Sequence, residues 1–164
     1  MLKRRHVLAA SVGGVVMLAA YRYRLPGAVA ADERFKVTHT DAEWRALLTP
    51  AQYAVLRRSS TERPYSSPLD GEHRAGLFAC AGCQLALFSS DTKFDSHTGW
   101  PSFWAPLENA VATSNDLLLG MMGKEVHCGQ CGGHLGHVFN DGPPPTRLRY
   151  CMNGVAMIFT PRAA

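Results

Sequence analysis

Cysteine offers the most chemistry in this 164-residue chain, and its five copies fall into two pairs and one single residue. Cys80 and Cys83 are separated by two residues, and so are Cys128 and Cys131. Cys151 has no cysteine left to pair with. The division indicates metal binding by the two pairs and thiol reactivity at the single residue.

The two CxxC pairs have the spacing of a zinc site. Two intervening residues let both thiolates of a pair reach one ion, and a glycine within each pair permits the tight turn that directs them inward. Together the pairs form a closed tetrahedral shell with no position for a substrate, so we predict one structural Zn²⁺ that connects two distant β segments. Two disulfides or a redox-active CxxC are the alternatives.

The neighbours of Cys151 favour a reactive thiol over an inert core cysteine. Arg149 is two residues away, and alternation along a strand would put Arg149, Cys151 and Asn153 on one face. A guanidinium lowers the pKa of a nearby thiol, and an amide can donate to an oxygen that gains charge. His134 and His137 are spaced so that two imidazoles can lie close together and donate a proton.

Two short helices are expected before this cysteine-rich region. Thr40 or Asp41 can cap the first, DAEWRALL, and Thr49 followed by Pro50 is a good start for the second, which continues as AQYAVLRRS. Apolar residues then face the core from both helices. These residues are Trp44, Leu47, Leu48, Tyr53, Val55 and Leu56.

From Gly76 onward, short apolar runs are interrupted by Gly, Pro, Asn and Asp, which is typical of strands joined by turns. We therefore predict a mainly β fold (small α+β), with antiparallel sheets of short strands held by the four-cysteine zinc site after two short N-terminal helices. Cys151 is expected to enter the final strand. The expected strands are 77–79, 85–88, 111–113, 117–121, 124–127, 137–139 and 155–160.

The basic charge of the chain lies in its first thirty residues. They contain five of the 17 Lys and Arg residues and no acid, so the remaining twelve cations face 13 Asp and Glu, about −1. A body with this balance gives no reason to expect nucleic-acid binding. The start has the pattern of an export signal: Lys3-Arg4-Arg5, a weakly apolar run from Val7 to Ala20, and small residues at 28–30.

This pattern divides the chain into three predicted parts. Residues 1–30 are predicted to be a twin-arginine-like export signal peptide, 31–39 a linker and 40–164 the folded domain. The apolar run is shorter than the ~20 residues of a membrane span, and glycines dilute it further. We expect an exported, periplasmic protein, with an uncleaved leader that tethers the domain to the membrane as the alternative.

Several motifs together resemble the B-type methionine sulfoxide reductases, which reduce the R epimer of methionine sulfoxide. The motifs are GWPSF at 99–103, HCGQCGGHLGHVFNDGP at 127–143 and RYCMN at 149–153, with EW at 43–44 and TERP at 61–64. They occur in order over roughly residues 40 to 160. The resemblance implies a peptide-methionine (R)-S-oxide reductase that repairs oxidised proteins.

The resemblance also implies roles for single residues. Cys151 matches the catalytic nucleophile, which ends the reaction as a sulfenic acid. His134, His137 and Asn153 match residues that bind and protonate the sulfoxide oxygen. The indole of Trp100 matches the group that receives the substrate's methyl group. Polar support for these groups is implied for Arg149 and Asp141, and zinc ligation for Cys80, Cys83, Cys128 and Cys131.

One departure from the family pattern concerns the resolving cysteine. Many members carry a second cysteine just before GWPSF, where this chain has Thr98. A sulfenic acid on Cys151 is therefore expected to need an external thiol reductant, a thioredoxin-like protein or a small thiol. We expect no cofactor beyond zinc and a monomeric chain. The rival functions are a thiol peroxidase that uses Cys151 and a non-enzymatic zinc-ribbon-like binding module.

Overall fold

The structure, a computed structural model, describes residues 35–115 and 123–163. The predicted export signal, the first part of the predicted linker and the strand expected at 117–121 lie outside these residues. Within the two described stretches, no helix is both long and apolar enough to cross a membrane.

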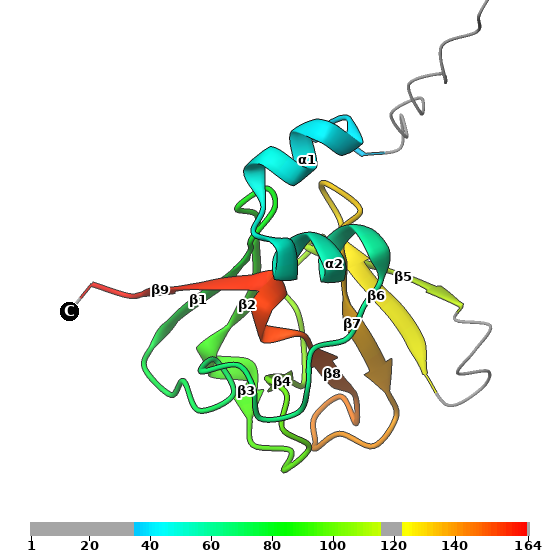
Figure 1. Cartoon of the computed structure of the whole chain (residues 1–164). Coiled ribbons are helices and arrows are strands. Elements are labelled where there is room, and N and C mark those ends of the chain that lie inside the picture. The colour runs from blue at the N-terminus through cyan, green and yellow to red at the C-terminus, as the bar shows by residue number, and fades with distance from the viewer. Residues whose placement is uncertain (1–34, 116–122, 164) are drawn as a thin grey trace, which may run out of the picture.

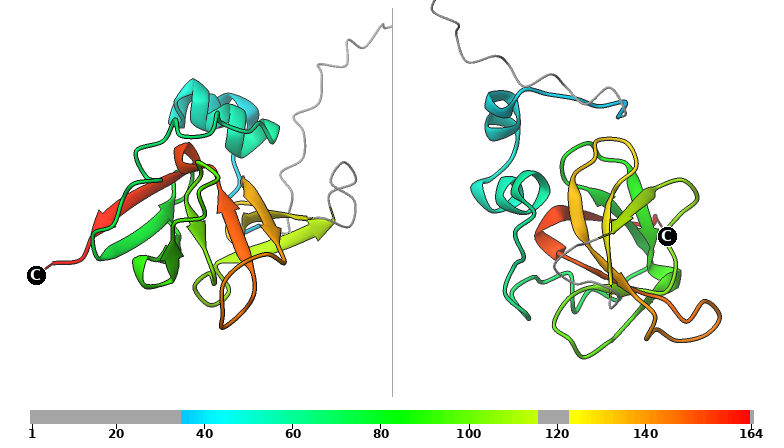
Figure 2. Two further views of the ribbon diagram at one scale, coloured as in Figure 1. Left: turned by 90° about the horizontal axis from the view of Figure 1, so that it is seen from below. Right: turned by 90° about the vertical axis from the view of Figure 1, so that its right-hand side faces the viewer.

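Both expected helices are present and both begin at the predicted threonines. Helix α1 (Asp41–Leu47) is capped by Thr40, and α2 (Pro50–Arg58) by Thr49. In each case the threonine hydroxyl accepts the N–H of the third helical residue, whose side chain bonds back to the threonine N–H. The helices lie on one side of the β structure (Figures 1 and 2).

The predicted core face of α1 is correct except at Leu47. Trp44 and Leu48, four residues apart, are buried, whereas Leu47 is 61% exposed. Helix α1 is short and lies at the outer edge of the molecule (Figure 1), so the protein covers only the narrow face that contains Trp44 and Leu48. Helix α2 buries all three of its expected residues, Tyr53, Val55 and Leu56.

The strands form two antiparallel sheets, as predicted for a mainly β fold. One sheet has the order β2-β1-β9 and the other has the order β3-β4-β8-β7-β6-β5. The rings of Phe78, Phe88 and Phe103 are fully buried and contact one another in the core. The strands are β1 (Gly76–Cys80), β2 (Ala86–Ser89), β3 (Lys93–Phe94), β4 (Ser102–Phe103), β5 (Val111–Asn115), β6 (Lys124–Cys128), β7 (His134–Phe139), β8 (Arg149–Met152) and β9 (Met157–Pro161).

The end of the chain differs from its prediction. The strand expected at 155–160 begins at Met157, because Gly154–Ala156 form a 3-10 turn, η3. Cys151 does not enter this last strand. It lies on the separate strand β8, which belongs to the other sheet. A four-residue strand without clear alternation gives a weak sequence pattern, and its identity depends on the neighbouring strands that bond to it.

Candidate active site and metal centre

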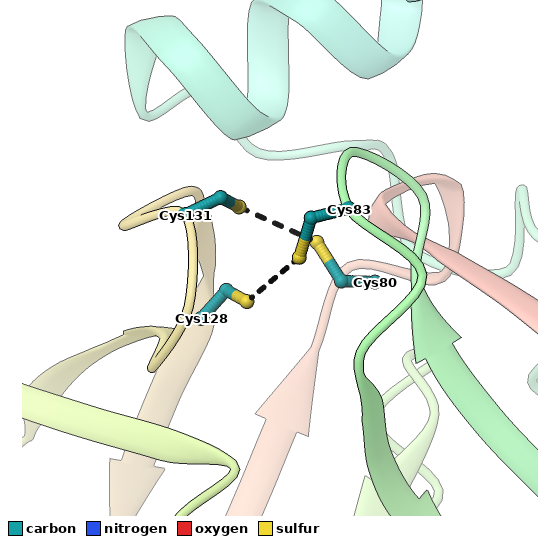
Figure 3. A group of neighbouring side chains, drawn as sticks. All are labelled: Cys80, Cys83, Cys128 and Cys131. Atoms are coloured by element: carbon teal, nitrogen blue, oxygen red, sulfur yellow. Dashed lines mark hydrogen bonds between the residues drawn. The ribbon is translucent and has the colours of Figure 1, made fainter. Parts of the chain in front are cut away.

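The four paired cysteines come together at the ends of two hairpins. Cys80 ends β1 and Cys128 ends β6, while Cys83 and Cys131 follow in the turns after these strands. Figure 3 shows the two pairs pointing toward each other from opposite turns. The predicted connection between two distant β segments is therefore present.

The sulfur positions fit one tetrahedral ion. All four Sγ atoms lie within 4.8 Å of one another, and the two contacts between pairs measure 3.7 and 3.5 Å. Zinc–sulfur bonds of ~2.3 Å in a tetrahedron put sulfurs ~3.8 Å apart. The cysteines are free thiols in this structure, and no pair approaches the ~2.05 Å of a disulfide. The cluster can hold a metal ion, and its all-sulfur donor set suits Zn²⁺.

Residues at the N-terminal end of the described chain lie against this metal cluster. The N–H of Val37 donates to the carbonyl oxygen of Gln130, 3.0 Å away, within the second CxxC turn. The ring of Phe35 packs edge-on against His127, next to Cys128. Part of the segment predicted as a linker therefore packs on the domain.

Cys151 occupies the middle of the six-stranded sheet, between two strands that both bear site residues. Its register partners are Ser102 on β4 and His137 on β7. Arg149 lies on the same strand, and its guanidinium makes two bonds to the carboxylate of Asp141, 2.9 and 2.8 Å long. The bond to Arg149 holds the pKa of Asp141 below its usual value. An ionised Asp141 therefore orients Arg149 beside the thiol.

A bulge in β7 brings the two histidines together. His134 pairs with His127 and Gly136 with Val126, so Leu135 is an extra residue in the register. Without it, residues three apart on a strand would point to opposite faces. With it, the rings of His134 and His137 lie 5.3 Å apart. Sequence spacing alone anticipates this contact but not its cause.

Glycine at position 136 is required by the close approach of β7 and β8. A Cβ atom at Gly136 would lie 2.2 Å from the carbonyl oxygen of Cys151, and the residue has a φ of +156°. A side chain here would push the two strands apart at the point where His137 and Cys151 face each other. The glycine of the HLGH motif therefore sets the separation between imidazole and thiol.

Glu125 is a site residue that the sequence analysis missed. Its carboxylate lies 2.8 Å from Nδ1 of the buried His134 and accepts the hydroxyl of Ser114 at 3.0 Å. Burial raises the pKa of Glu125, but the bonds to His134 and Ser114 outweigh burial and leave that pKa below its usual value. The ionised carboxylate keeps a proton on Nδ1 of His134. Glu125 lies in the strand expected at 124–127, but its contact with His134 forms only when β6 pairs with β7.

Glu62, within the TERP motif, connects the two remaining predicted residues. Its N–H donates to Oδ1 of Asn153 at 2.9 Å, and its carbonyl oxygen accepts the indole N–H of Trp100 at 3.2 Å. Its carboxylate accepts the N–H groups of Gly154 and Val155, at 2.6 and 2.9 Å. We call these contacts the Glu62 clamp. The clamp attaches the loop after α2 to Trp100 and to the end of β8.

Asn153 does not continue the face of β8 on which alternation would place it. It is the residue before η3, is 3% exposed, and its Nδ2 donates to the carbonyl oxygen of Leu135 at 3.0 Å. The amide oxygen of Asn153 accepts the N–H of Glu62. An amide nitrogen has two protons, so Asn153 retains one donor for an oxygen at the site. The alternation argument fails here because the chain turns immediately after Met152.

A family model described as the SelR domain matches residues 48–161, more than half of the chain and every site residue described above. The chain belongs to the SelR family. A peptide methionine sulfoxide reductase MsrB of Agrobacterium fabrum (strain C58) is 53% identical over 127 residues, covering 77% of this chain and 94% of that protein. An MsrB of Pseudomonas putida (strain W619) is 54% identical over 128 residues, covering 77% and 96%.

The predicted resemblance to B-type methionine sulfoxide reductases is thereby confirmed. Among solved structures, the Yippee-like domain of Mis18 aligns with 56% of this chain and all of that chain, at 18% identity and a TM-score of 0.42. That likeness is too low for any comparison of function.

The thiol of this SelR domain is not strongly ionised on its own. Burial raises the pKa of Cys151 above its usual value, while Arg149, followed by the hydroxyl of Thr98, acts in the opposite direction. Arg149 lowers the pKa of Cys151 and so favours the thiolate, as expected. Burial is nevertheless the larger effect, so the free enzyme keeps most of the thiol protonated at neutral pH.

A cavity of about 720 Å³ elsewhere in the SelR domain lies between α2 and β9. Val55, Leu69 and Phe159 are among its lining residues. Glu62 and Gly154 also line it, but none of the predicted site residues does. The cavity is therefore separate from the group of predicted site residues around Cys151.

Proposed function

We propose that the protein reduces (R)-methionine sulfoxide in oxidised proteins to methionine, with Cys151 as nucleophile and an external thiol as reductant. The single observation that carries this proposal is the register of β8, in which Cys151 faces His137 across one strand pair. A nucleophile and a proton donor then meet at one point. The relatives named MsrB support the substrate class.

In the first step, the Cys151 thiolate attacks the sulfoxide sulfur. The oxygen of the sulfoxide must gain a proton, and it ends on the cysteine sulfur as a sulfenic acid while methionine leaves. Methionine sulfoxide is reduced to methionine by two electrons, and Cys151 is oxidised by two. We assign proton donation to the His134–His137 pair, whose Glu125 contact holds a proton at one end.

Binding of the substrate is assigned to Trp100 and Asn153. Trp100 lies two residues before β4, and the Glu62 clamp fixes its indole N–H, so an aromatic face is available to the methyl group. Asn153 contributes its one remaining N–H to the sulfoxide oxygen. Arg149, oriented by Asp141, places positive charge beside the attacking sulfur.

In the second step, an external thiol reduces the sulfenic acid. The first thiol displaces water and forms a mixed disulfide with Cys151, and a second releases Cys151 as a thiol. Overall, one sulfoxide and two thiols give methionine, one disulfide and water. This route is supported by Thr98, whose hydroxyl contacts Cys151 Sγ, and by the gathering of the other four cysteines in the metal cluster. An ion held by these four sulfurs would be structural, because its shell would have no position for a substrate.

The test is a dithiothreitol-driven assay on separated R and S epimers of methionine sulfoxide, with the native chain and Cys151→Ser. We expect the native chain to reduce the R epimer and the variant to be inactive, with equal metal content in both. Equal activity of the two proteins, preference for the S epimer, or faster turnover of hydroperoxides would contradict the proposal.

We also propose that the domain acts after export. Support comes from the sequence alone: the paired arginines, the weakly apolar run and the small residues at 28–30. Fractionation of cells that express the full chain, compared with an Arg4→Lys and Arg5→Lys double variant, tests this. Twin-arginine export predicts that the variant stays in the cytoplasm, and an equal distribution of both chains would contradict that route.

A further inference from the structure

A chain of hydroxyl groups runs from Cys151 into the protein. The Oγ1 atom of Thr98 lies 3.9 Å from Sγ of Cys151. The hydroxyl of Ser96 lies 2.8 Å from Thr98 and 2.7 Å from the hydroxyl of Ser102. Ser102 in turn lies 3.1 Å from the carbonyl oxygen of Trp100. Four contacts in series thus connect the reactive sulfur to a backbone carbonyl.

The number of protons decides the direction of these four contacts. A hydroxyl donates one proton, and a carbonyl oxygen only accepts. When Cys151 is a thiol, its S–H and the three hydroxyls satisfy all four contacts if every donor points toward Trp100. A thiolate can only accept, so Thr98 must then donate to the sulfur, Ser96 to Thr98, and Ser102 to Ser96. Only the contact with the Trp100 carbonyl loses its proton.

We propose that Thr98, Ser96 and Ser102 form a hydrogen-bond relay that reverses when Cys151 ionises and so stabilises the attacking thiolate. Thr98 touches the reacting sulfur and is a catalytic residue in this sense. Ser102, the register partner of Cys151, also interacts with the sulfur directly, whereas Ser96 acts through these two hydroxyls as a positioning residue. The burial of Ser102, which is 1% exposed, keeps water from replacing the relay at its inner end. The relay serves the proposed reduction, but its existence does not depend on the substrate.

The relay approaches the sulfur from a different side than the charged groups do. Arg149 reaches Cys151 along β8, with Asp141 behind it, and His137 faces it from β7. The hydroxyls come from β4 and the loop before it. Removal of the relay should therefore weaken the thiolate while Arg149 and His137 remain in place. Because Ser96 contacts the sulfur's partners Thr98 and Ser102 and not the sulfur itself, its effect should become smaller when Thr98 is absent.

The test measures the alkylation rate of Cys151 by iodoacetamide against pH, with metal-loaded full chains and peptide mapping to follow this cysteine alone. Thr98→Val should slow alkylation at neutral pH by about tenfold, because a charged acceptor loses a donor. Thr98→Ser should restore the native profile, and Thr113→Val, an exposed threonine on β5, should not change it. Ser96→Ala should slow alkylation by a smaller factor.

The decisive comparison is the double variant. Ser96→Ala should slow alkylation by a smaller factor in the Thr98→Val background than in the native chain, and a full additive effect would overturn the relay. An unchanged profile for Thr98→Val would overturn it as well. If Thr98→Val loses its metal, Ser96→Ala against the native chain carries the test, and no slowing there counts against the relay. None of these readouts uses a sulfoxide, so the relay and the proposed function fail separately.

Discussion

Replacing Thr98 with cysteine should change the way in which oxidised Cys151 is resolved. The threonine hydroxyl lies 3.9 Å from Cys151 Sγ, and a disulfide needs its sulfurs ~2.05 Å apart. The two sulfurs therefore have to approach by about 2 Å at most, because a C–S bond also reaches further than a C–O bond. We expect Thr98→Cys to form an internal disulfide with Cys151 after one turnover.

The expected advantage of the internal thiol is large. A group tethered within reach has an effective concentration of about 1 mM or more, so it outcompetes about 10 µM external thiol about a hundredfold. The assay gives each chain one equivalent of methionine (R)-sulfoxide without reductant, then measures intact mass and dimedone trapping. The native chain should become about 16 Da heavier as a sulfenic acid and react with dimedone. The variant should become about 2 Da lighter and not react.

Thr98→Ser is the matched control, since it keeps a hydroxyl and adds no thiol. It should behave as the native chain does in both readouts. If Thr98→Cys is trapped by dimedone as fully as the native chain, the hydroxyl position does not lie on the path of the oxidised sulfur. The assignment of Thr98 to the place of a resolving cysteine would then be refuted.

The metal cluster, the Glu62 clamp and the buried thiol each have a measurable consequence. Chelation of the metal should raise the number of thiols that react with Ellman's reagent from one per chain to five, whereas disulfides in the pairs would leave it at one. Glu62→Gln should lower the free energy of unfolding in urea by about 2 kcal/mol, since two N–H groups lose a charged acceptor. The control Glu108→Gln, at an exposed glutamate, should change the free energy of unfolding by less than about 0.5 kcal/mol. Equal losses in the two variants would contradict the clamp. Because burial raises the pKa of Cys151 above the usual 9.0, its alkylation rate should still increase as pH passes that value, and a plateau below about pH 8 would disprove this.

Local chemistry made the helices and the metal ligands predictable. A threonine followed three residues later by Glu43 or Gln52 closes a capping box within one turn, and the sequence contains all of that information. The CxxC spacing is equally local, because each pair needs only a tight turn to direct two sulfurs at one ion. The SelR motifs then supplied the candidate residues around Cys151.

Contacts between distant segments decided the features that the sequence did not predict. The exposure of Leu47 depends on how little of α1 the protein covers, which no helical period reveals. The contact of His134 with His137 needs the extra residue of β7, which exists only relative to β6. Glu62 supports the site because its loop reaches both Trp100 and Asn153, the residue that follows β8. Asn153 is 91 positions away from Glu62 in the chain.

The sequence by itself determined that this chain has two CxxC pairs suited to one metal ion, a fifth cysteine outside those pairs, and threonine at position 98. Those facts depend on residue type and short spacing, which folding does not alter. Only the tertiary structure decided that Thr98, Ser96 and Ser102 form a series ending at Cys151, and that burial outweighs Arg149 at its sulfur. Hydrogen-bond direction and burial are properties of packed groups, so they arise only when the strands and the loop come together.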